Sequence, residues 1–529
     1  MTRYDAIVVG AGAGGGVAAN VLAQRGFRVL ILEQGPWLDF ATSGRDHLRN
    51  HRLPQYGDNT GLKPEENPRV FVDGTGNPHI VLSYQGGFNH NATAVGSGTF
   101  LYGAQAWRFH PYDLQMASVY GVPEGSSLAD WPIGYEDLVP WYERVEDEIG
   151  VCGSPPAEEM PARREYPMPP TALPEKGRRL QEAAKGLGWS TQRVPLLINS
   201  VPHDGRAACV NCQHCVGFAC PVDAKNGTQN TAIPRALATG NATLLTEASV
   251  LRVNLVDGRA TGVTYVKDGV ETNVEAPVVV VAGGAIESAR LLLLSGVESD
   301  HLGRHLQGHY YHGAHGIFPD EVWDGIGPGA SVATLRFNHG NEEVIGGAMM
   351  ADDFIATPIS FAKGSRPVGI PGWGQAHKEW MRHAYPRFVT ASGPVQEIPS
   401  PTSRVSLDPW VTDSLGRPVA RLSGTTHPET IRTSLFINAR GAEWLRAAGC
   451  ETVWVNEPVL RLSGGQHQSG TCRMGDDPTT SVVDRNGKVH GIEGLYVADG
   501  SVHVTNGGFN PVLTIMALAM RTASAIPDV

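Results

Sequence analysis

The sequence predicts an α/β fold (α+β overall), with a Rossmann-like dinucleotide-binding domain and a second domain built on an antiparallel β-sheet. Three observations support this: a strand, glycine turn and helix at the start, a length of 529 residues, and a composition rich in glycine and proline. A chain of this length exceeds what one hydrophobic core usually organises. The 64 glycines and 37 prolines indicate many strands and ordered loops rather than a helical bundle.

The N-terminal segment follows the order strand, glycine turn, helix, strand and acid. A β-branched run predicts a buried strand at residues 5–9, and a glycine-rich turn follows at residues 10–15. An apolar helical pattern then continues to about residue 25. A second strand is predicted at residues 28–32, directly before Glu33. This order is typical of the first half of a dinucleotide-binding domain.

Each part of this segment has a physical reason. Gly10 permits the tight turn, Gly12 lets the backbone approach a pyrophosphate, and Gly15 lets the helix pack closely on the strand. The helix N-terminus near Ala13 offers N–H groups and a partial positive charge to phosphates. Glu33 lies where an acid accepts hydrogen bonds from the adenosine ribose. The segment therefore predicts a dinucleotide site, although this motif alone does not separate FAD from NAD.

Further segments, in chain order, carry a resemblance to a known family. They read Ala-Val-Gly-Ser-Gly-Thr-Phe-Leu-Tyr-Gly at 94–103, Gly-Gly-Ala-Ile-Glu-Ser-Ala-Arg-Leu-Leu at 283–292, His-Gln-Ser-Gly-Thr-Cys-Arg-Met-Gly at 467–475, Gly-Leu-Tyr-Val-Ala-Asp-Gly at 494–500 and Asn-Gly-Gly-Phe-Asn-Pro-Val-Leu-Thr-Ile at 506–515. With the N-terminal turn, this ordered set resembles the glucose–methanol–choline (GMC) oxidoreductases. The resemblance is much weaker from about residue 300 to 455, where the family's substrate domain would lie.

The resemblance implies FAD as the cofactor. It implies a discontinuous FAD-binding domain that consists of residues 1–110, 205–300 and 455–529. Residues 111–204 would form a connecting helical segment, and residues 301–454 a substrate-binding domain. The further FAD-binding residues that it implies are Gly98, Thr99, Val250, Asp499, Gly500, Asn510 and Pro511. Some relatives tether the flavin through a histidine in the loop that matches residues 99–103, which here contains none. We therefore expect non-covalent FAD, unless the nearby His90 is recruited.

The pattern of the C-terminal elements predicts where two of these residues lie relative to the cofactor. Residues 495–498 predict a buried strand that ends at Asp499, and ligands of α/β sheets lie beyond the carboxyl ends of the strands. We therefore expect Asp499 to face the ribityl chain and the pyrophosphate. Pro511 suits the first turn of the last helix, which leaves helix N–H groups aimed at the flavin ring.

Oxidation of an alcohol by a flavin needs a base for the hydroxyl proton and a donor that holds the developing alkoxide. The resemblance places His467 at the position of the base and Asn510 at that of the donor, and both would contact substrate. The alternatives are a structural role for His467, one of nineteen histidines, and an N-cap role for Asn510 before Pro511. His503 is a rival base outside the matched position.

Four of the seven cysteines lie within twelve residues: Cys209, Cys212, Cys215 and Cys220. The run is one residue longer than a ferredoxin-type run, so an iron–sulfur cluster that carries electrons away from the flavin is one interpretation. The favoured interpretation is a metal-free loop near the flavin, which many relatives without a cluster share. Reduced flavin would then pass its electrons to oxygen or to a quinone-type acceptor.

The rest of the chain predicts the structure of the substrate side, which is the substrate-binding domain at 301–454 with the helices beside it. Amphipathic helices are predicted at residues 136–149 and 177–187, and short alternating strands between Gly/Pro loops predict the antiparallel sheet at 301–454. Residues 363–387 hold six glycines and prolines near their start and predict a long loop. We interpret this loop as a lid or, with equal weight, as an oligomer contact.

One segment gives a finer resemblance. Residues 393–400 read Gly-Pro-Val-Gln-Glu-Ile-Pro-Ser and resemble bacterial pyranose oxidases and glycoside 3-oxidases of the GMC group. By that resemblance Gln396 could hydrogen-bond a sugar hydroxyl, while a buried glutamine that ties strands together is an equal alternative. Asn91, Tyr102 and Gln105 are weaker substrate candidates near the flavin loop.

The leading functional hypothesis is FAD-dependent oxidation of a secondary ring hydroxyl, C2 or C3, of a sugar or glycoside, with oxygen or a quinone as acceptor. The alternatives are a dehydrogenase subunit that uses the cysteine cluster, a lyase with a redox-silent flavin, and a substrate such as a small alcohol, choline or a sterol. The net charge of −11 argues against a nucleic-acid partner. Without a membrane-length apolar run or a secretory leader, we expect a cytoplasmic enzyme, with a homo-oligomer left open.

Overall fold

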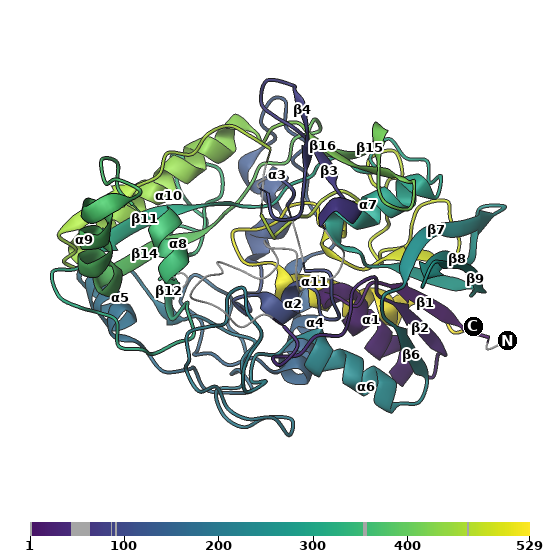
Figure 1. Ribbon diagram of the computed structural model, residues 1–529, viewed down its shortest axis with the longest axis horizontal. Helices are drawn as coiled ribbons and strands as arrows, with labels where there is room; N and C mark the ends of the chain where they lie inside the picture. Colours follow the sequence, from purple (N-terminus) through teal and green to yellow (C-terminus); the bar gives the residue numbers. More distant parts are fainter. Residues whose placement is uncertain are drawn as a thin grey trace.

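The computed structural model describes residues 3–43, 64–85, 87–89, 92–352, 357–364, 366–462 and 465–529. His90 and Asn91, which the sequence singled out, lie outside the described residues. Two large regions stand side by side in Figure 1, one around a parallel sheet at the right and one around an antiparallel sheet at the left. The two ends of the chain lie close together at the right-hand edge.

Five short strands form a parallel sheet in the order β18–β10–β1–β2–β6. They are β1 (Ala6–Val9), β2 (Val29–Leu32), β6 (Ala242–Leu245), β10 (Val278–Val281) and β18 (Leu495–Val497). The register places Val8 between Ile31 and Val280. Every residue of β1, β2 and β10 is buried, which explains why these strands read as unbroken apolar runs. The predicted Rossmann-like fold is confirmed.

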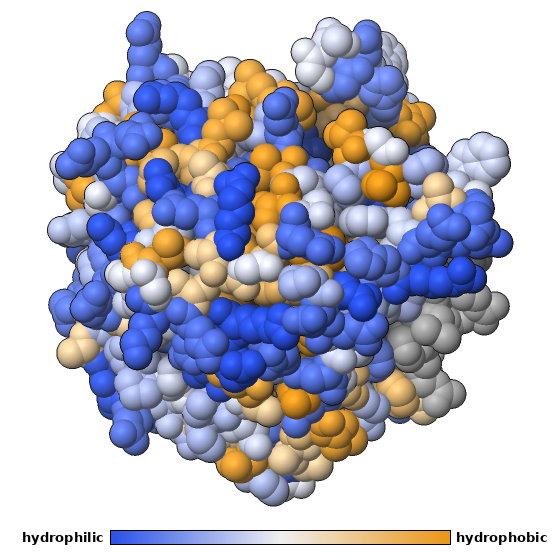
Figure 2. Space-filling model, turned by 90° about the vertical axis from the view of Figure 1, so that its left-hand side faces the viewer, coloured by the Kyte–Doolittle hydropathy of each residue, from blue (hydrophilic) through white to orange (hydrophobic). Residues whose placement is uncertain are grey.

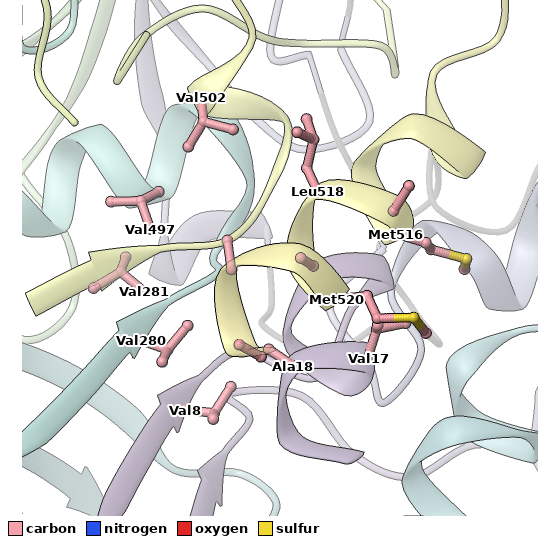
Figure 3. Close-up of a cluster of buried hydrophobic side chains, with 14 of the residues drawn as sticks. Val8, Val17, Ala18, Val280, Val281, Val497, Val502, Met516, Leu518 and Met520 are labelled. Atoms are coloured by element: carbon pink, nitrogen blue, oxygen red, sulfur yellow. The ribbon is translucent and has the colours of Figure 1, made fainter. Parts of the chain in front are cut away.

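Helices pack around this sheet. Helix α1 (Ala13–Gln24) packs against α6 (Ala232–Ala238) and α11 (Val512–Ala525), and α11 also contacts α4 (Tyr135–Val145). Figure 3 shows apolar side chains of the strands and helices in one cluster, with Val8 and Val280 from the sheet, Ala18 from α1 and Met520 from α11. The N-terminal and C-terminal helices therefore share one core, although they lie at opposite ends of the sequence.

The parallel sheet and the helices around it form the nucleotide region, and two smaller sheets flank it. Strands β7 (Ser249–Val256), β8 (Arg259–Lys267) and β9 (Val270–Glu275) form an antiparallel sheet. The other sheet has the order β15–β16–β3–β4, with β15 (Arg404–Thr412), β16 (Pro418–Ser423), β3 (Arg69–Val72) and β4 (Pro78–Val81). Helix α7 (Gly284–Leu294) packs against β7, β15 and β16, so it joins both sheets.

The second large region is a six-stranded sheet in the order β17–β11–β14–β13–β12–β5. Its strands are β5 (Gln192–Arg193), β11 (Tyr310–Ile317), β12 (Val332–Thr334), β13 (Met350–Ala351), β14 (Phe388–Val395) and β17 (Thr452–Val455). The strand pairs are antiparallel, as predicted. Helix α10 (Pro428–Ala447) lies against β11 and β14, and α5 (Glu175–Gly186) packs on α10. Figure 2 shows the outer face of this region as largely hydrophilic, with apolar residues in smaller groups.

The prediction of a long loop at residues 363–387 is wrong. Helix α8 (Pro358–Gly364) ends at its start, α9 (Gly374–Ala384) occupies its centre, and a short 3-10 helix (Tyr385–Arg387) ends it. Gly364 ends α8, Gly374 begins α9, and the other four of the six glycines and prolines lie in the connection, whereas residues 375–384 contain neither residue and are mostly helix formers. Among the described residues, no helix combines the length and apolar character needed to cross a membrane.

The remaining elements are short or irregular. They are α2 (Gly98–Leu101), α3 (Met116–Tyr120), the π-helix η4 (Glu146–Gly150), and the 3-10 helices η2 (Pro64–Glu66), η3 (Pro111–Leu114), η5 (Thr228–Asn230) and η7 (Gly500–Val502). Two of them contain residues that the sequence assigns to the cofactor, with Gly98 and Thr99 in α2 and Gly500 in η7.

Candidate active site

The glycine turn before α1 lets three backbone segments approach one another. Gly10 has a φ of +101°, and a Cβ there would lie 2.5 Å from Ala282 O. A Cβ on Gly14 would lie 1.8 Å from Ala498 O, and one on Gly15 would lie 2.0 Å from Gly10 O. Because the neighbours are backbone atoms, no side chain fits at these positions without moving the chain. The turn is therefore fixed against the ends of β10 and β18.

The N-terminus of α1 keeps backbone donors for a ligand. Gly12 is the N-cap residue, no described side chain caps the helix, and no acidic residue occupies the first turn, which starts at Ala13. A Cβ on Gly12 would meet only the Ser97 side chain, at 3.2 Å, and one on Gly98 would meet no described atom within 4 Å. Open space thus lies against this backbone, and uncapped N–H groups at a helix N-terminus fit a pyrophosphate.

Glu33 follows β2 and is 5% exposed. Its carboxylate accepts hydrogen bonds from Ala11 N and Gly35 N, both at 2.9 Å. Burial raises the pKa of Glu33 to about 7, and the backbone N–H groups of Gly35, Ala11 and Gln34 oppose this shift. An ionised carboxylate has about four acceptor sites, so it can still accept from a ribose hydroxyl. These donors and acceptors fit the adenosine end of FAD.

Asp499, at the end of β18, bonds to protein donors through both carboxylate oxygens. Oδ2 accepts from Gly284 N at 2.9 Å and from Ser288 Oγ at 2.5 Å. Oδ1 accepts from the backbone N and the Oγ of Ser501, at 2.8 and 2.5 Å. Asp499 thereby joins α7 to η7, whose first residue, Gly500, is buried. A contact between Asp499 and the ribityl chain stays a prediction.

Two other implied cofactor residues also have structural bonds. Thr99 Oγ1 donates to Gly96 O at 2.7 Å and accepts from Thr228 N at 3.1 Å. Val250 lies half-buried in β7, and its carbonyl accepts from Arg417 Nη1 at 3.0 Å. These bonds fix the position of the loop and strand, and cofactor contacts of both residues stay predictions.

His467 lies half-buried and faces a second histidine. Its Nδ1 is 2.8 Å from Nδ1 of His309, and the two rings meet at an interplanar angle of 83°. On the other side of the His309 ring, Nε2 lies 2.9 Å from Gly507 O and 3.0 Å from Asn506 O. The histidine pair therefore connects the predicted base to the segment before α11.

Asn506 holds the backbone on both sides of this histidine pair. Its Nδ2 donates to His467 O at 2.6 Å and to Gly308 O at 3.1 Å. Its Oδ1 lies 3.2 Å from His503 Nδ1. One buried side chain thus joins the His467 segment, the start of β11 and the segment after η7.

Asn510 is 8% exposed, and its Oδ1 is buried without a hydrogen-bond partner among the described residues. Helix α11 has Pro511 as its N-cap residue and no capping side chain, so Asn510 does not cap the helix. Pro511 accordingly precedes the first turn, which starts at Val512, instead of lying within it. A buried amide oxygen without a protein partner fits a group that contacts a bound ligand.

His503, the rival base, is fully buried between two aromatic rings. The ring centroids of Phe109 and Trp131 lie 5.6 and 5.2 Å from that of His503. Burial lowers the pKa of His503 to about 4. Packing between these rings and the bond to Asn506 hold the imidazole in place, while its Nε2 is buried without a hydrogen-bond partner among the described residues, so its role as a rival base stays a prediction.

Gln396 ties separate segments together. Its Oε1 accepts from Gly347 N at 3.0 Å, and its Nε2 donates to the Asp113 carboxylate. Gln396 is 2% exposed, and Asp113 is fully buried. Because both ends of the amide are bonded to protein, this geometry favours the structural alternative over a contact with substrate.

The weaker substrate candidates also have protein partners. The Tyr102 hydroxyl donates to Asn226 O. The Oε1 of Gln105 accepts from Trp107 Nε1 at 2.8 Å. These bonds favour packing roles near the flavin loop for both residues.

Comparison with known proteins identifies the family. GMC oxidoreductase models match residues 126–311 and 399–519, and an NAD(P)-binding Rossmann-like model matches residues 8–71. The chain is 31% identical to paromamine 6'-oxidase of Streptomyces fradiae, over 99% of this chain and 91% of the relative. It is 30% identical to 2-methyl-1,2-propanediol dehydrogenase of Mycolicibacterium austroafricanum, over 99% and 95%. The chain belongs to the GMC oxidoreductase family.

The fold and the class of reaction follow from this membership. Formate oxidase of Aspergillus oryzae RIB40 has the same fold, with a TM-score of 0.64 and 16% identity over 99% of this chain and 98% of that chain. GMC oxidoreductases and these structural neighbours are FAD-binding flavoproteins. The present GMC oxidoreductase acts on CH–OH groups of alcohols or sugar-like compounds. The relatives are oxidoreductases, so the lyase alternative has no support.

In this GMC oxidoreductase the clustered cysteines lie in a loop that packs beside α2. Gly217 N donates to Leu101 O at 2.6 Å, and Phe218 shares a small core with Leu101. The buried Lys225 donates through Nζ to the carbonyls of Cys215 and Phe218, at 2.6 and 2.8 Å. Within the described part of the chain, no group of three or more His, Cys, Asp or Glu side chains could hold a metal ion. The packing of this loop beside α2 and its bonds to Lys225 fit the interpretation as a structural loop, and the iron–sulfur cluster stays untested.

Sequence reasoning did not assign a role to His309 or Asn506. Asn506 begins the segment 506–515 that resembles the family, and this position is the sign of a functional role that the sequence offers. His309 carries no local mark, because it is one of nineteen histidines and precedes an ordinary strand. Its partner, His467, lies 158 residues away in sequence, and only the fold brings the two together.

Proposed function

We propose that this protein oxidises a secondary ring hydroxyl, at C2 or C3, of a sugar or glycoside to the keto sugar. The observation that carries the proposal is His467, whose Nδ1 lies 2.8 Å from His309 and whose carbonyl accepts from Asn506. An imidazole held through both its ring and its backbone suits a general base near neutral pH. Relatives named as a paromamine oxidase and a propanediol dehydrogenase support an alcohol substrate.

Two side chains divide the chemistry in this proposal. His467 takes the hydroxyl proton of the substrate, and Asn510 Nδ2 donates to the oxygen that becomes negatively charged. When bound, FAD supplies the acceptor for the hydride that leaves the alcohol carbon. The burial of Asn510 limits competition from water for that oxygen. Its Oδ1, which has no described protein partner, would accept from a neighbouring substrate hydroxyl.

The cofactor is held without a covalent bond in this proposal. The uncapped N-terminus of α1 would bind the pyrophosphate, and Glu33 would accept from the ribose. Residues 1–110, 205–300 and 455–529 would form the FAD-binding domain, and 301–454 the substrate-binding domain. Electrons would leave to oxygen or a quinone-type acceptor. All seven cysteines are free thiols, which supports a cytoplasmic enzyme.

A second candidate reaction differs in the position that is oxidised. The relative named paromamine 6'-oxidase, at 31% identity, favours a hydroxyl at position 6 of a sugar. Both candidates use the same two side chains, because the chemistry at the hydroxyl is the same. They differ in which carbon lies nearest the flavin and His467.

The test combines position-blocked sugars with anaerobic flavin spectra. Methyl glucoside should bleach the flavin band near about 450 nm, a typical position for this cofactor. The 2-deoxy or 3-deoxy analogue should fail to bleach it, while the 6-deoxy analogue should react. Failure of the 6-deoxy analogue alone would move the assignment to position 6. No bleaching with any sugar would overturn the substrate proposal.

Two variants test the base. His467→Ala should lower kcat by about 10³-fold, within the usual contribution of general acid–base catalysis. His79→Ala is the matched control, because His79 is an exposed histidine bonded to Asp73 in a separate sheet. FAD content should be the same in both variants. Wild-type rates in His467→Ala would remove His467 from the mechanism.

A further inference from the structure

We propose that His309 is a positioning residue that sets the tautomer of His467, so that the lone pair of His467 lies on Nε2. This inference rests on the proposed role of His467 as the base. The contacts of His309 determine which of its own ring nitrogens carries hydrogen, and that nitrogen in turn determines the tautomer of its neighbour.

The first step concerns His309 Nε2. It lies 3.0 Å from Asn506 O and 2.9 Å from Gly507 O. Backbone carbonyls only accept hydrogen bonds, so this nitrogen must carry the hydrogen. In a neutral imidazole, the other nitrogen, Nδ1, then holds the lone pair.

The second step concerns the contact between the two rings. Nδ1 of His309 lies 2.8 Å from Nδ1 of His467. A bond of this length needs one hydrogen between the two nitrogens, and His309 Nδ1 has none to give. His467 must therefore donate from Nδ1, which leaves its lone pair on Nε2.

The neutral state of His309 follows from its surroundings. His309 is 5% exposed, and burial lowers its pKa to about 4. The carbonyls of Gly507 and Asn506 oppose this shift, as does the carboxylate of Asp113, but each has a smaller effect than burial. At neutral pH, the ring therefore accepts from His467 and does not present a second N–H to it.

The geometry is held by more than the two rings. Asn506 Nδ2 donates to Gly308 O and to His467 O, so one side chain fixes the backbone beside both histidines. The carbonyl of Asn506 in turn accepts from His309 Nε2. The pair cannot exchange its donor and acceptor roles without breaking these carbonyl contacts.

The consequence for the reaction concerns one proton. The alcohol proton moves to His467 Nε2, His467 becomes an imidazolium, and His309 stays neutral. The Nδ1–H of His467 still donates to His309, and this bond is stronger when the donor carries a charge. His309 therefore orients the base before the proton transfer and stabilises it afterwards.

Leucine has a volume similar to that of histidine but no hydrogen-bond acceptor, so it removes the acceptor at His309 and keeps the packing. His309→Leu should lower kcat by about 10- to 100-fold, the range for loss of a group that orients an imidazole. KM should change less than threefold. The acidic limb of the kcat profile should move to lower pH by up to about one unit, because the imidazolium loses a stabilising bond. Loss of packing alone would leave this limb in place.

Replacement of His309 by asparagine is the conservative control. His309→Asn keeps an oxygen near the place of Nδ1, so it should recover much of kcat and the wild-type acidic limb. Wild-type kcat and an unshifted limb in FAD-loaded His309→Leu would overturn the proposal. If that variant fails to fold, ¹⁵N spectra of histidine-labelled wild type decide, with His309 assigned by its absence in His309→Asn. A signal typical of an Nδ1-protonated His309 would overturn the proposal.

The controls separate this inference from the proposed function. If no sugar bleaches the wild-type flavin, the proposed function fails, and the ¹⁵N spectrum still reports the tautomer of His309. If sugars react and His467→Ala is inactive while His309→Leu behaves as wild type, only the inference fails. If His467→Ala keeps its activity, both the assignment of the base and the inference fall.

Discussion

The glycine turn at the parallel sheet and the candidate site residues near the antiparallel sheet differ in the kind of contact that fixes them. Around the parallel sheet the deciding contacts are between backbone atoms, as at Gly14, where a Cβ would lie 1.8 Å from Ala498 O. The candidate site residues on the substrate side are held by single side-chain bonds between distant residues, although the sheet itself has close backbone contacts, as at Gly393, where a Cβ would lie 1.7 Å from Met349 O. Gln396 reaches Asp113, 283 residues away in sequence. The same holds for the histidine pair, which lies between the two regions.

This difference determines which contacts can be recognised from a pattern in the sequence. A backbone contact excludes every side chain, so it leaves a glycine at a fixed place in a motif. A bond between two side chains leaves two ordinary polar residues, each with many equivalents in the chain. The glycine turn should therefore be sensitive to small additions of volume, and the candidate site residues on the substrate side to the loss of a partner.

The largest expected effect is at the glycine turn. Gly14→Ala places a methyl group 1.8 Å from Ala498 O, on the backbone that leads to Asp499. Since the neighbour is backbone, relief needs a shift of α1 away from β18, at about 3 kcal/mol or more. Purified protein should lack FAD, as measured by absorption, and unfold at a lower temperature. Retention of FAD at the wild-type level would contradict the backbone argument.

The second effect concerns the substrate side. Gln396→Leu removes the donor to Asp113 and the acceptor for Gly347 N, leaving a buried N–H without a partner. We expect a loss of about 2 kcal/mol in the free energy of unfolding, measured by denaturant titration, with KM changed less than twofold.

The same substitution at an exposed site is the control for this experiment. Gln375→Leu, on α9, removes only a bond to Glu379 and should leave stability unchanged. A Gln396→Leu variant with normal stability and a strongly raised KM for glucosides would instead assign Gln396 to substrate binding.

Gly14 and Gln396 illustrate what could and could not be predicted from the sequence. The strands, α1 and the glycine turn were predictable because apolar runs and glycines record local constraints. His467 and Asn510 were nominated by motif, whereas His309 was not, because nothing near it in sequence points to a partner 158 residues away. Residues 363–387 were mispredicted because glycines and prolines near the start were extended over a helix-forming stretch.

The third prediction concerns pH in the nucleotide region. Burial raises the pKa of Glu33 to about 7, above its ordinary value of 4.5. Its contribution to the stability of the apoprotein is therefore present below pH 4.5 and lost as pH rises through about 7. FAD affinity has the opposite dependence, because the ionised carboxylate accepts from the ribose. The Kd for FAD should fall about tenfold between pH 6 and pH 8.

A neutral analogue separates Glu33 from other titrating groups. Glu33→Gln cannot ionise, so its Kd for FAD should be flat across the same range and close to the wild-type value at pH 6. Fluorescence quenching during reconstitution of the apoprotein measures both series. A flat wild-type curve would show that the ionisation of Glu33 is not coupled to FAD binding and would contradict this prediction.

The smallest expected effect is at a glycine of the other region. Gly186 ends α5, is exposed, and a Cβ there would meet no described atom within 4 Å. Gly186→Ala should therefore raise the free energy of unfolding by about 0.5 kcal/mol, because alanine favours the helix and restricts the unfolded chain. Calorimetry should detect a rise of about 1 °C in Tm, with unchanged FAD content. A loss of FAD or of stability here would contradict the argument that an added methyl group is costly only where it meets backbone atoms, as at Gly14.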